Sequence, residues 1–392
     1  MALNHNNFIF TSESVSEGHP DKVCDQISDV ILDMYLSEDK NSRVACETLA
    51  TKNTVIISGE IKSNLDEKKI NKELIEKKIK EKIKEIGYEQ KGFDWKTINI
   101  KNYLHEQSAD ISMGVDRDES LGAGDQGIMF GYACSETQSL MPAPIFYSHR
   151  ILEFLSSYRK NNDTFFYPDA KSQVSMLYEN GIPKKITSLV LSTQHTDSID
   201  NVSIKKKVIE IIEQAVPTNI LPSQQDILIN PTGRFVIGGP DGDTGLTGRK
   251  IIVDTYGGSA PHGGGAFSGK DYTKVDRSAA YMARYIAKNI VGARIASKCL
   301  IQLSYAIGVA EPISIYIQTD SDSKVDNNKL IKVIKNNFDL SPLGIKKFLE
   351  LDRPIYTPTA AYGHFGRDYD KVNNLFTWEK LGSTDLIIND YS

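Results

Sequence analysis

The chain has 392 residues, of which 40% are apolar and 25% charged, and its formal net charge is −5. This length exceeds what one hydrophobic core usually holds, so we expect two or three domains. The nearly balanced charge excludes a general attraction to nucleic acid or to an anionic membrane surface, so any anion site must be local. Eighteen consecutive apolar residues, the length of a membrane span, occur nowhere, and the four scattered cysteines fit a reducing compartment. We therefore predict a cytoplasmic protein.

Residues 1–106 are predicted to form a first α+β unit with the element order β-α-β-β-α-β. Apolar runs and apolar side chains at helical spacing predict the following ranges: strand 8–10, helix 20–35, strands 43–50 and 54–61, helix 66–86 and strand 97–101. Pro20 suits the first turn of its helix, where a missing N–H costs nothing. His19 and Asp21 are thereby placed at the positive N-terminal end of that helix.

The same order of elements recurs twice. The second unit, residues 122–236, is predicted to contain strand 128–133, helix 144–158, strands 171–178 and 185–192, helix 203–215 and strand 226–229. The third unit, residues 237–392, is predicted to contain strand 250–254, helix 274–291, strands 298–307 and 314–318, helix 327–336 and, from Asp370 onward, a tail of no evident role. We therefore expect an α+β fold of three similar units in a pseudo-threefold arrangement, with each sheet covered by helices on one face. The open face of each sheet favours oligomerisation.

A polar segment without apolar periodicity, residues 107–121, joins the first two units. Long segments of this kind inside a compact protein are usually functional lids or disordered. We predict a mobile loop that closes over an active site, and a merely permissive surface linker is the alternative. Gly122, Gly124 and Gly127 surround Asp125 just before a strand, which indicates that this end of the loop is ordered.

Glycine is concentrated between Gly238 and Gly269, where it fills eleven of 32 positions. Such density serves either disorder or a close approach of backbone to a ligand, and the apolar run 251–253 followed by a strong helix argues against disorder. Charged and imidazole side chains lie among and just after these glycines: Asp243, Arg249, Lys250, His262, Lys270 and Lys274. Backbone N–H groups, cations and a carboxylate together indicate a polyphosphate site with a metal. A set of tight turns would explain the glycines but not the charges.

The run from Gly264 to Lys270 fits the G-x-x-x-x-G-K pattern of a phosphate-binding loop, but Asp271 stands where that motif needs a hydroxyl. A phosphate-loop ATPase or kinase is therefore one alternative, which transfer of the γ-phosphate would reveal. A non-catalytic nucleotide-binding scaffold is another, and it would need the glycines but not the full set of cations. Oxygen ligands for Mg²⁺ are available in Asp21, Asp243 and Asp276, although each could equally be a helix cap or a surface pair.

Five runs closely resemble the S-adenosylmethionine synthetase (methionine adenosyltransferase) family: Phe10 to Asp29, Gly122 to Ala133, Asp169 to Val174, Asn230 to Gly258 and Gly263 to Ala280. Weaker similarity covers nearly the whole chain. The resemblance implies a three-part α+β fold and a homotetramer built as a dimer of dimers, with the active site at the dimer interface. It also implies that the sulfur of L-methionine attacks C5′ of ATP, and that the released tripolyphosphate is hydrolysed to phosphate and pyrophosphate.

The resemblance further implies site residues, carried over motif by motif. Residues expected to act on the phosphates are His19, Lys171, Arg249, Lys250 and Lys270. Positions expected at the bound nucleotide are Asp125, Asp169, Ala170, Lys171, Arg234, Phe235, Asp243, Arg249, Lys250, Ala266 and Lys270. Positions expected at methionine are Glu60, Gln107, Asp243 and Lys274. Asp21 and Asp276 are expected to bind Mg²⁺, two ions per site, and Glu47 to bind K⁺.

Overall fold

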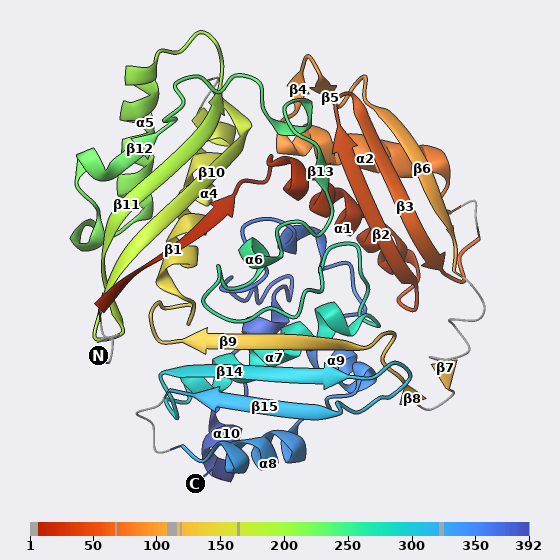
Figure 1. Cartoon of the computed structure of the whole chain (residues 1–392). Helices are drawn as coiled ribbons and strands as arrows, with labels where there is room; N and C mark the ends of the chain where they lie inside the picture. The colour runs from red at the N-terminus through yellow and green to blue at the C-terminus, as the bar shows by residue number, and fades with distance from the viewer. Residues whose placement is uncertain are drawn as a thin grey trace.

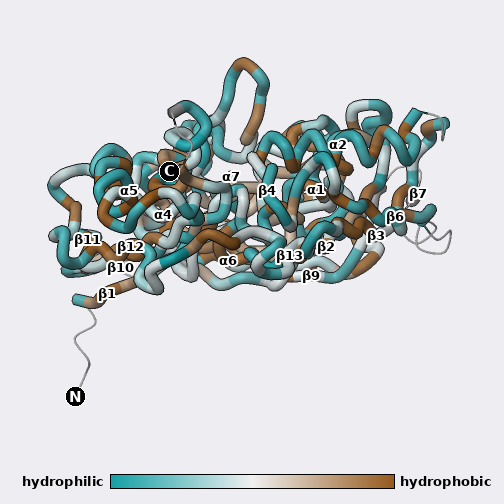
Figure 2. The backbone as a smooth tube through the Cα atoms, turned by 90° about the horizontal axis from the view of Figure 1, so that it is seen from above, coloured by the Kyte–Doolittle hydropathy of each residue, from teal (hydrophilic) through white to brown (hydrophobic). Residues whose placement is uncertain are grey.

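The computed structural model describes residues 7–66, 69–107, 116–117, 120–162, 165–320 and 325–391. Three sheets of three or four strands surround the segment that carries the short helix α6 (Ile251–Asp254), which lies at the centre of Figure 1. Seen from above, α1, α2, α4 and α5 lie on one side of the molecule and the main strands on the other (Figure 2). The predicted α+β class is confirmed, and the pseudo-threefold relation of the units stays a prediction.

The first sheet has four strands, in the order β13 (Gly245–Leu246), β2 (Arg43–Thr51), β3 (Thr54–Lys62) and β6 (Asn99–Glu106). It is covered by α1 (Pro20–Glu38) and α2 (Lys72–Ile86). In α1 every residue from Pro20 to Leu32 is buried, including four charged side chains. A small hairpin of β4 (Glu89–Gln90) and β5 (Phe93–Asp94) follows α2.

The second and third sheets are built in the same layered way. The second has the order β1 (Asn7–Val15), β10 (Phe166–Glu179), β11 (Ile182–His195) and β12 (Ile227–Ile229), with α4 (Ala143–Asn162) and α5 (Asn201–Ala215) against it. The third has the order β15 (Ser314–Thr319), β14 (Lys298–Tyr305) and β9 (Gly127–Cys134), with α7 (Val275–Gly292) and α8 (Asn327–Asn337) against it.

Strands are exchanged between the predicted units. β1 pairs with β10, so that Asn7 lies opposite Glu179 and Val15 opposite Lys171. Likewise β9 pairs with β14, and β13 pairs with β2. The prediction that each contiguous unit forms a sheet of its own is therefore wrong. Alternation of side chains predicts a strand but not its partner, because any neighbouring strand can satisfy the same backbone N–H and C=O groups.

One predicted element differs from the structure in type, and one predicted helix begins six residues later than expected. Residues 250–254, predicted as a strand, form the helical turn α6 instead, because an apolar run this short fits a buried helical turn as well as a strand. The helix predicted from 66 begins at Lys72, where the side chain of Asn71 caps it by accepting a hydrogen bond from the N–H of Leu74 at 2.9 Å.

The tail, for which the sequence indicated no role, packs on α7. Trp378 is fully buried and stacks on Tyr281 with 3.8 Å between ring centroids. Glu379, also buried, accepts hydrogen bonds from Arg284 and Lys288. Two further helices, α9 (Pro342–Leu349) and α10 (Thr384–Tyr391), complete this region. The tail is therefore part of the hydrophobic core that supports α7.

Most of the predicted mobile loop lies outside the described residues, which include only Gln107 and the strand pair β7 (Asp116–Arg117) and β8 (Ser120–Leu121) of segment 107–121. Over the described parts of the chain, no helix combines the length and the apolar character needed to cross a membrane.

Candidate active site

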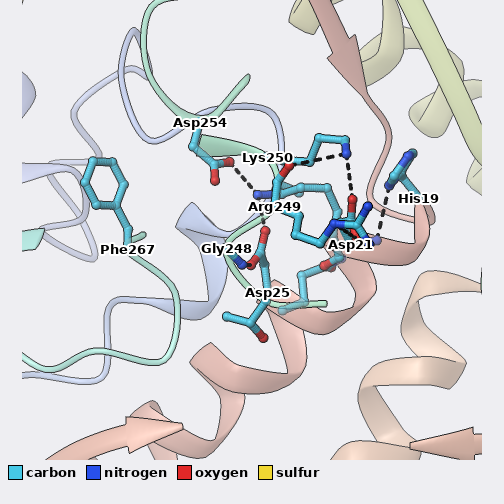
Figure 3. A network of polar contacts seen from close by, with 12 residues as sticks. His19, Asp21, Asp25, Gly248, Arg249, Lys250, Asp254 and Phe267 are labelled. Atoms are coloured by element: carbon cyan, nitrogen blue, oxygen red, sulfur yellow. Dashed lines mark hydrogen bonds and ion pairs between the residues drawn. The ribbon is translucent and has the colours of Figure 1, made fainter. Parts of the chain in front are cut away.

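The N-terminus of α1 brings two predicted residues against a distant part of the chain (Figure 3). His19 is the N-cap, and its Nδ1 accepts a hydrogen bond from the N–H of Asp21 at 3.2 Å. The Asp21 carboxylate accepts hydrogen bonds from the N–H of Leu246 at 2.9 Å and from Nζ of Lys250 at 2.6 Å. The first turn of α1 is thereby fastened to the glycine-rich segment.

Arg249 and Lys250 lie directly before α6 and face the same turn of α1 (Figure 3). Nε of Arg249 is 4.0 Å from Oδ1 of Asp21, and its side chain is 56% exposed. Lys250 is more deeply placed, because Asp21 holds its ammonium group. The predicted phosphate-binding cations and a predicted Mg²⁺ ligand thus meet at one helix N-terminus, where anions are favoured.

The protonation states at this turn follow from burial and neighbouring charges. Burial, together with the positive charge of Lys250, lowers the pKa of His19 to about 3. The imidazole is therefore neutral near pH 7, and because Nδ1 accepts a hydrogen bond, Nε2 carries the proton and can donate. In the free protein His19 is therefore a neutral hydrogen-bond donor and not a cation. Burial works to raise the pKa of Asp21, but hydrogen bonds from Lys250 and Leu246 outweigh it and lower that pKa, so Asp21 is ionised.

Strand β10 adds Asp169, Ala170 and Lys171 beside this turn. The buried Asp169 accepts a hydrogen bond from the N–H of Gly239 at 2.8 Å, and the carbonyl of Ala170 accepts one from the N–H of Ser16. Nζ of Lys171 is 3.7 Å from Oε2 of Glu13. The charge of Lys171 reaches His19 and contributes to its lowered pKa, so both belong to one electrostatic group.

The remaining predicted residues of this side lie on the segment 234–243, on either side of Gly239. The exposed Arg234 pairs with Asp197 at 2.8 Å. Phe235 exchanges backbone and side-chain hydrogen bonds with His195, at 2.9 Å and 3.1 Å. Asp243 is exposed, and its negative charge acts on Asp169. We call the whole set the phosphate group; its members are His19, Asp21, Asp169, Ala170, Lys171, Arg234, Phe235, Asp243, Arg249 and Lys250.

The buried carboxyl of Asp169 should make the stability of the protein depend on pH. Burial raises the pKa of this carboxyl from 3.8 to about 6, with the charge of Asp243 adding to the rise and Lys171 opposing it. The folded state therefore binds more protons than the unfolded state between about pH 4 and 6, so the free energy of unfolding falls as pH rises through that window. Asp169→Asn keeps an oxygen that can accept the hydrogen bond from Gly239, but it cannot ionise. The variant should therefore not lose stability as pH rises, and at pH 7.5 it should be more stable than the unmodified protein by up to about 3 kcal/mol.

The measurement is the difference in melting temperature between Asp169→Asn and the unmodified protein at pH 4.5 and at pH 7.5. Asp197→Asn, which changes an exposed carboxylate, is the matched control and should show no such pH-dependent difference. An equal effect of Asp169→Asn at both pH values would contradict the raised pKa.

A second set of predicted residues gathers at the N-terminus of α7. Nζ of Lys270 donates to Oδ2 of Asp276 at 2.7 Å, and Lys274 pairs with Asp271. All residues of α7 from Arg277 to Val291 are buried, whereas Asp276 is partly exposed. Gly265 approaches Asp276 so closely that a Cβ would come within 2.3 Å of its Cγ, which explains the glycine.

The edge of the first sheet lies next to Lys270. Ala45 forms an isolated bridge with Lys270, and in the ladder Ala45 lies opposite Glu60. Glu60 is 3.7 Å from Nε2 of His105, and the N–H of Gln107 bonds to the carbonyl of Ile61. We call this set the methionine group; its members are Glu60, Gln107, Lys270, Lys274 and Asp276. Glu47 lies two residues farther along β2 than Ala45, and Gly124, next to Asp125, approaches the backbone of Thr273. Ala266 lies between the two groups, because a Cβ on Gly248 would come within 2.6 Å of its Cβ.

The two groups are close but separate within one chain. Asp21 lies in the first turn of α1, whereas the N–H of Gly269, next to Lys270, bonds to Asp29 two turns later at 2.8 Å. Eight residues at 1.5 Å each place these points about 12 Å apart along the helix. Within the described ranges, no hydrogen bond or ion pair joins a side chain of the phosphate group to one of the methionine group.

Each group contains one of the two carboxylates expected to bind Mg²⁺, Asp21 and Asp276. Asp21 is ionised, and Asp276 is held by a lysine, so both provide the anionic oxygens that this ion prefers. Among the described residues, no group of three or more His, Cys, Asp or Glu side chains is arranged to hold a metal. Mg²⁺ is commonly bound through one or two carboxylates together with phosphate oxygens and water, so single carboxylates fit an ion that binds with a polyphosphate.

Sequence reasoning did not find a set of buried charged partners behind the phosphate group: Lys22, Asp25, Asp29, Asp254 and Arg277. A signal was present, because positions 22, 25 and 29 share the spacing of the buried face of α1. Their partners come from the glycine-rich segment and α7, which no local pattern could indicate. Asp29, for example, receives two hydrogen bonds from Arg277, at 2.7 and 2.8 Å.

The sequence matches one protein family over nearly its whole length. Family models of the N-terminal, central and C-terminal domains of S-adenosylmethionine synthetase match residues 7–109, 120–235 and 237–380. The S-adenosylmethionine synthase of Zymomonas mobilis is 56% identical over 388 residues, covering 97% of this chain and 98% of the relative. That of Rhodospirillum centenum is 57% identical over 387 residues, 97% of each chain. That of Pelagibacter ubique is 56% identical over 390 residues, 98% of this chain and 99% of the relative. The chain therefore belongs to the S-adenosylmethionine synthetase family, and it is an enzyme, a methionine adenosyltransferase.

Proposed function

We propose that the chain makes S-adenosylmethionine from ATP and L-methionine by attack of the methionine sulfur on C5′ of ATP. The released tripolyphosphate is then hydrolysed to phosphate and pyrophosphate. The observation that carries the proposal is the phosphate group, in which Lys171, Arg249, Lys250 and the N–H donor of His19 converge on the N-terminus of α1. These donors suit a long, highly charged phosphate chain.

The chemistry explains why cations dominate this site. A thioether is a neutral nucleophile, so its attack needs no general base. The difficult part is the leaving group, on which negative charge develops as the C5′–O bond breaks. Donors and cations that are already in place can stabilise that charge without reorganising during the reaction. Arg249, Lys250 and Lys171 would bind the phosphate chain in this way, and Lys270 would add a cation from the methionine group.

Asp21 and Asp276 would hold two Mg²⁺ ions per site, and Glu47 on β2 would give an oxygen to K⁺. Bound Mg²⁺ would neutralise charge on the phosphate oxygens. In the free protein, Lys250 and Lys270 pair with these same carboxylates, which keeps both oxygens and both ammonium groups near the place where a phosphate would bind.

The other predicted positions complete the proposal. Asp125, Asp169, Ala170, Arg234, Phe235, Asp243 and Ala266 would contact the nucleoside. Glu60, Gln107, Asp243 and Lys274 would contact methionine. Support comes from Gln107, whose side-chain oxygen is buried and makes no hydrogen bond with any described residue. An unpaired buried acceptor is costly unless a ligand satisfies it, and the ammonium group of methionine would do so.

We further propose a homotetramer, built as a dimer of dimers, in which the phosphate group of one subunit faces the methionine group of another. The separation of the two groups within one chain supports a shared site. So do apolar side chains that the third sheet exposes on the face opposite the helices: Ile128 and Tyr316 are 48% and 50% exposed. Ile252 of α6, close in sequence to Arg249, is also 43% exposed. The proposed domains remain residues 1–106, 122–236 and 237–392, and the proposed loop is 107–121. The predicted location remains the cytoplasm.

The experiment is to incubate the protein with ATP, methionine, Mg²⁺ and K⁺ and to identify all products by chromatography. We expect S-adenosylmethionine, phosphate and pyrophosphate, formed only when methionine is present. Formation of ADP would support a kinase or ATPase instead. Nucleotide binding without turnover would support a non-catalytic scaffold.

A further inference from the structure

A buried ion triplet lies directly behind the phosphate group. Nζ of Lys22 donates to Oδ2 of Asp25 at 2.8 Å and also to Oδ1 of Asp254. The exposed fractions of the three side chains are 0%, 1% and 4%. Lys22 and Asp25 are one turn apart on α1, whereas Asp254 ends α6, so the triplet joins two elements that are far apart in sequence.

Asp25 also binds the loop that directly precedes Arg249 and Lys250. Its Oδ1 accepts a hydrogen bond from the N–H of Gly248 at 2.9 Å, as Figure 3 shows. Gly248 has a φ of +78°, and a Cβ there would come within 2.6 Å of the Cβ of Ala266, so this backbone position has little room to move. Arg249 and Lys250 are therefore held from both sides. Asp25 binds the backbone of Gly248, directly before Arg249, and the pair of Lys22 with Asp254 fixes α6, directly after Lys250.

The far side of the triplet is closed by His364, which precedes the tail. Nε2 of His364 is 4.0 Å from Oδ1 of Asp254, and Nδ1 of the same ring hydrogen-bonds with the hydroxyl of Tyr281 at 2.7 Å. The ring of His364 packs edge-on against Phe267, 4.8 Å away between centroids. Asp254 is therefore enclosed by α1, by His364 and by the glycine-rich segment.

Stability alone is a weak reason to keep such a triplet. Removing charges from water is costly, and replacing buried ion pairs by apolar residues of similar volume is often neutral or stabilising. One ammonium group also faces two carboxyl groups, and burial raises the pKa of Asp254 to about 7. Charges and directional hydrogen bonds fix the position of the groups that they bind, whereas apolar side chains do not.

We propose that Lys22, Asp25 and Asp254 form a positioning cluster, which sets Arg249 and Lys250 in the geometry that binds the phosphate chain. This inference rests on the proposed function. The three residues do not touch the substrate; they act through the backbone of Gly248 and through α6. A displacement of about 1 Å in a catalytic group can reduce the rate about 100-fold, so the cluster can matter for turnover without contributing to stability.

The test compares Asp25→Ala, which removes the anchor of Gly248, with Asp25→Asn, which keeps an oxygen acceptor for it. Glu379→Gln is the matched control, because it breaks another fully buried ion pair, on α7 and the tail. The readouts are melting temperature, kcat, the KM for methionine, and inhibition by inorganic tripolyphosphate. All three variants should lose thermal stability. We expect Asp25→Ala alone to lose about 100-fold in kcat and to bind tripolyphosphate more weakly.

The KM for methionine should change little in Asp25→Ala, because the methionine group lies elsewhere. Asp25→Asn should recover at least about tenfold of the lost kcat, which a merely structural role would not produce. The inference is overturned if Asp25→Ala and Glu379→Gln lose kcat equally at a temperature where both are folded. An unmodified protein that makes no S-adenosylmethionine would instead refute the proposed function itself.

A second variant covers the case in which Asp25→Ala does not fold. The triple replacement Lys22→Met, Asp25→Leu and Asp254→Leu removes every charge of the triplet and keeps the volume filled, so it should retain most of the stability. We expect it to be folded and about 100-fold slower than the unmodified protein. A folded triple variant with unchanged kcat would overturn the inference.

Discussion

Arg249→Ala is expected to lower kcat by about 100- to 1000-fold, the usual cost of removing one preorganised charge from a site that stabilises developing negative charge. The protein should fold normally, because the side chain is 56% exposed and its closest carboxylate, Asp21, is 4.0 Å away. Asp21 keeps its hydrogen bonds from Leu246 and Lys250 in the variant. The loss should therefore appear in turnover and not in stability.

The measurement is kcat together with the melting temperature. Lys184→Ala, which removes an exposed cation of β11 outside both groups, is the control and should leave both quantities unchanged. Parallel losses of stability and activity in Arg249→Ala would assign Arg249 a structural role. An unchanged kcat would remove it from the site.

A mixture of two inactive variants should regain activity if the site is shared between subunits. Arg249→Ala damages the phosphate group and Lys270→Ala damages the methionine group. In a twofold-symmetric mixed dimer, one site then receives both defects and the other receives neither. Random exchange makes about half of the dimers mixed, so about a quarter of the wild-type activity should return.

The matched control mixes Arg249→Ala with Lys171→Ala. Both changes lie in the phosphate group, so every site in every mixed dimer keeps a defect and no activity should return. Native mass spectrometry would establish that the subunits have exchanged. Equal behaviour of the two mixtures after exchange would mean that each chain contains a complete site.

Local patterns in the sequence predicted most elements of this fold. Pro20 and the apolar spacing that follows it placed the start of α1 correctly, and the hairpin of β2 and β3 was found from two runs around a tight turn. The pairing of β1 with β10 was not found, because that partner lies more than one hundred and fifty residues along the chain. Residues 250–254 were assigned to a strand, because five residues are too few for periodicity to separate a strand from a helical turn.

The side chains of the site were predicted from motifs, but their electrostatic states were not. The charge of His19 depends on its burial and on Lys250, and these two are brought together only by folding. Likewise Lys22 and Asp25 share a helix face in the sequence, whereas Asp254, which completes their triplet, comes from more than two hundred residues away. Sequence patterns identify which ionisable side chains are present. Packing decides which of these side chains are charged and which partners they bind.

The central claim, that the whole phosphate chain leaves from C5′, can be tested with ATP that carries oxygen-18 in the bridge between C5′ and the α-phosphorus. Products of the reaction with methionine, Mg²⁺ and K⁺ would be analysed by mass spectrometry. Attack of sulfur on C5′ breaks the carbon–oxygen bond, so the label should appear entirely in the phosphate and pyrophosphate, and none in S-adenosylmethionine. Label retained on the nucleoside product would show that a phosphorus–oxygen bond breaks instead, and would contradict the account.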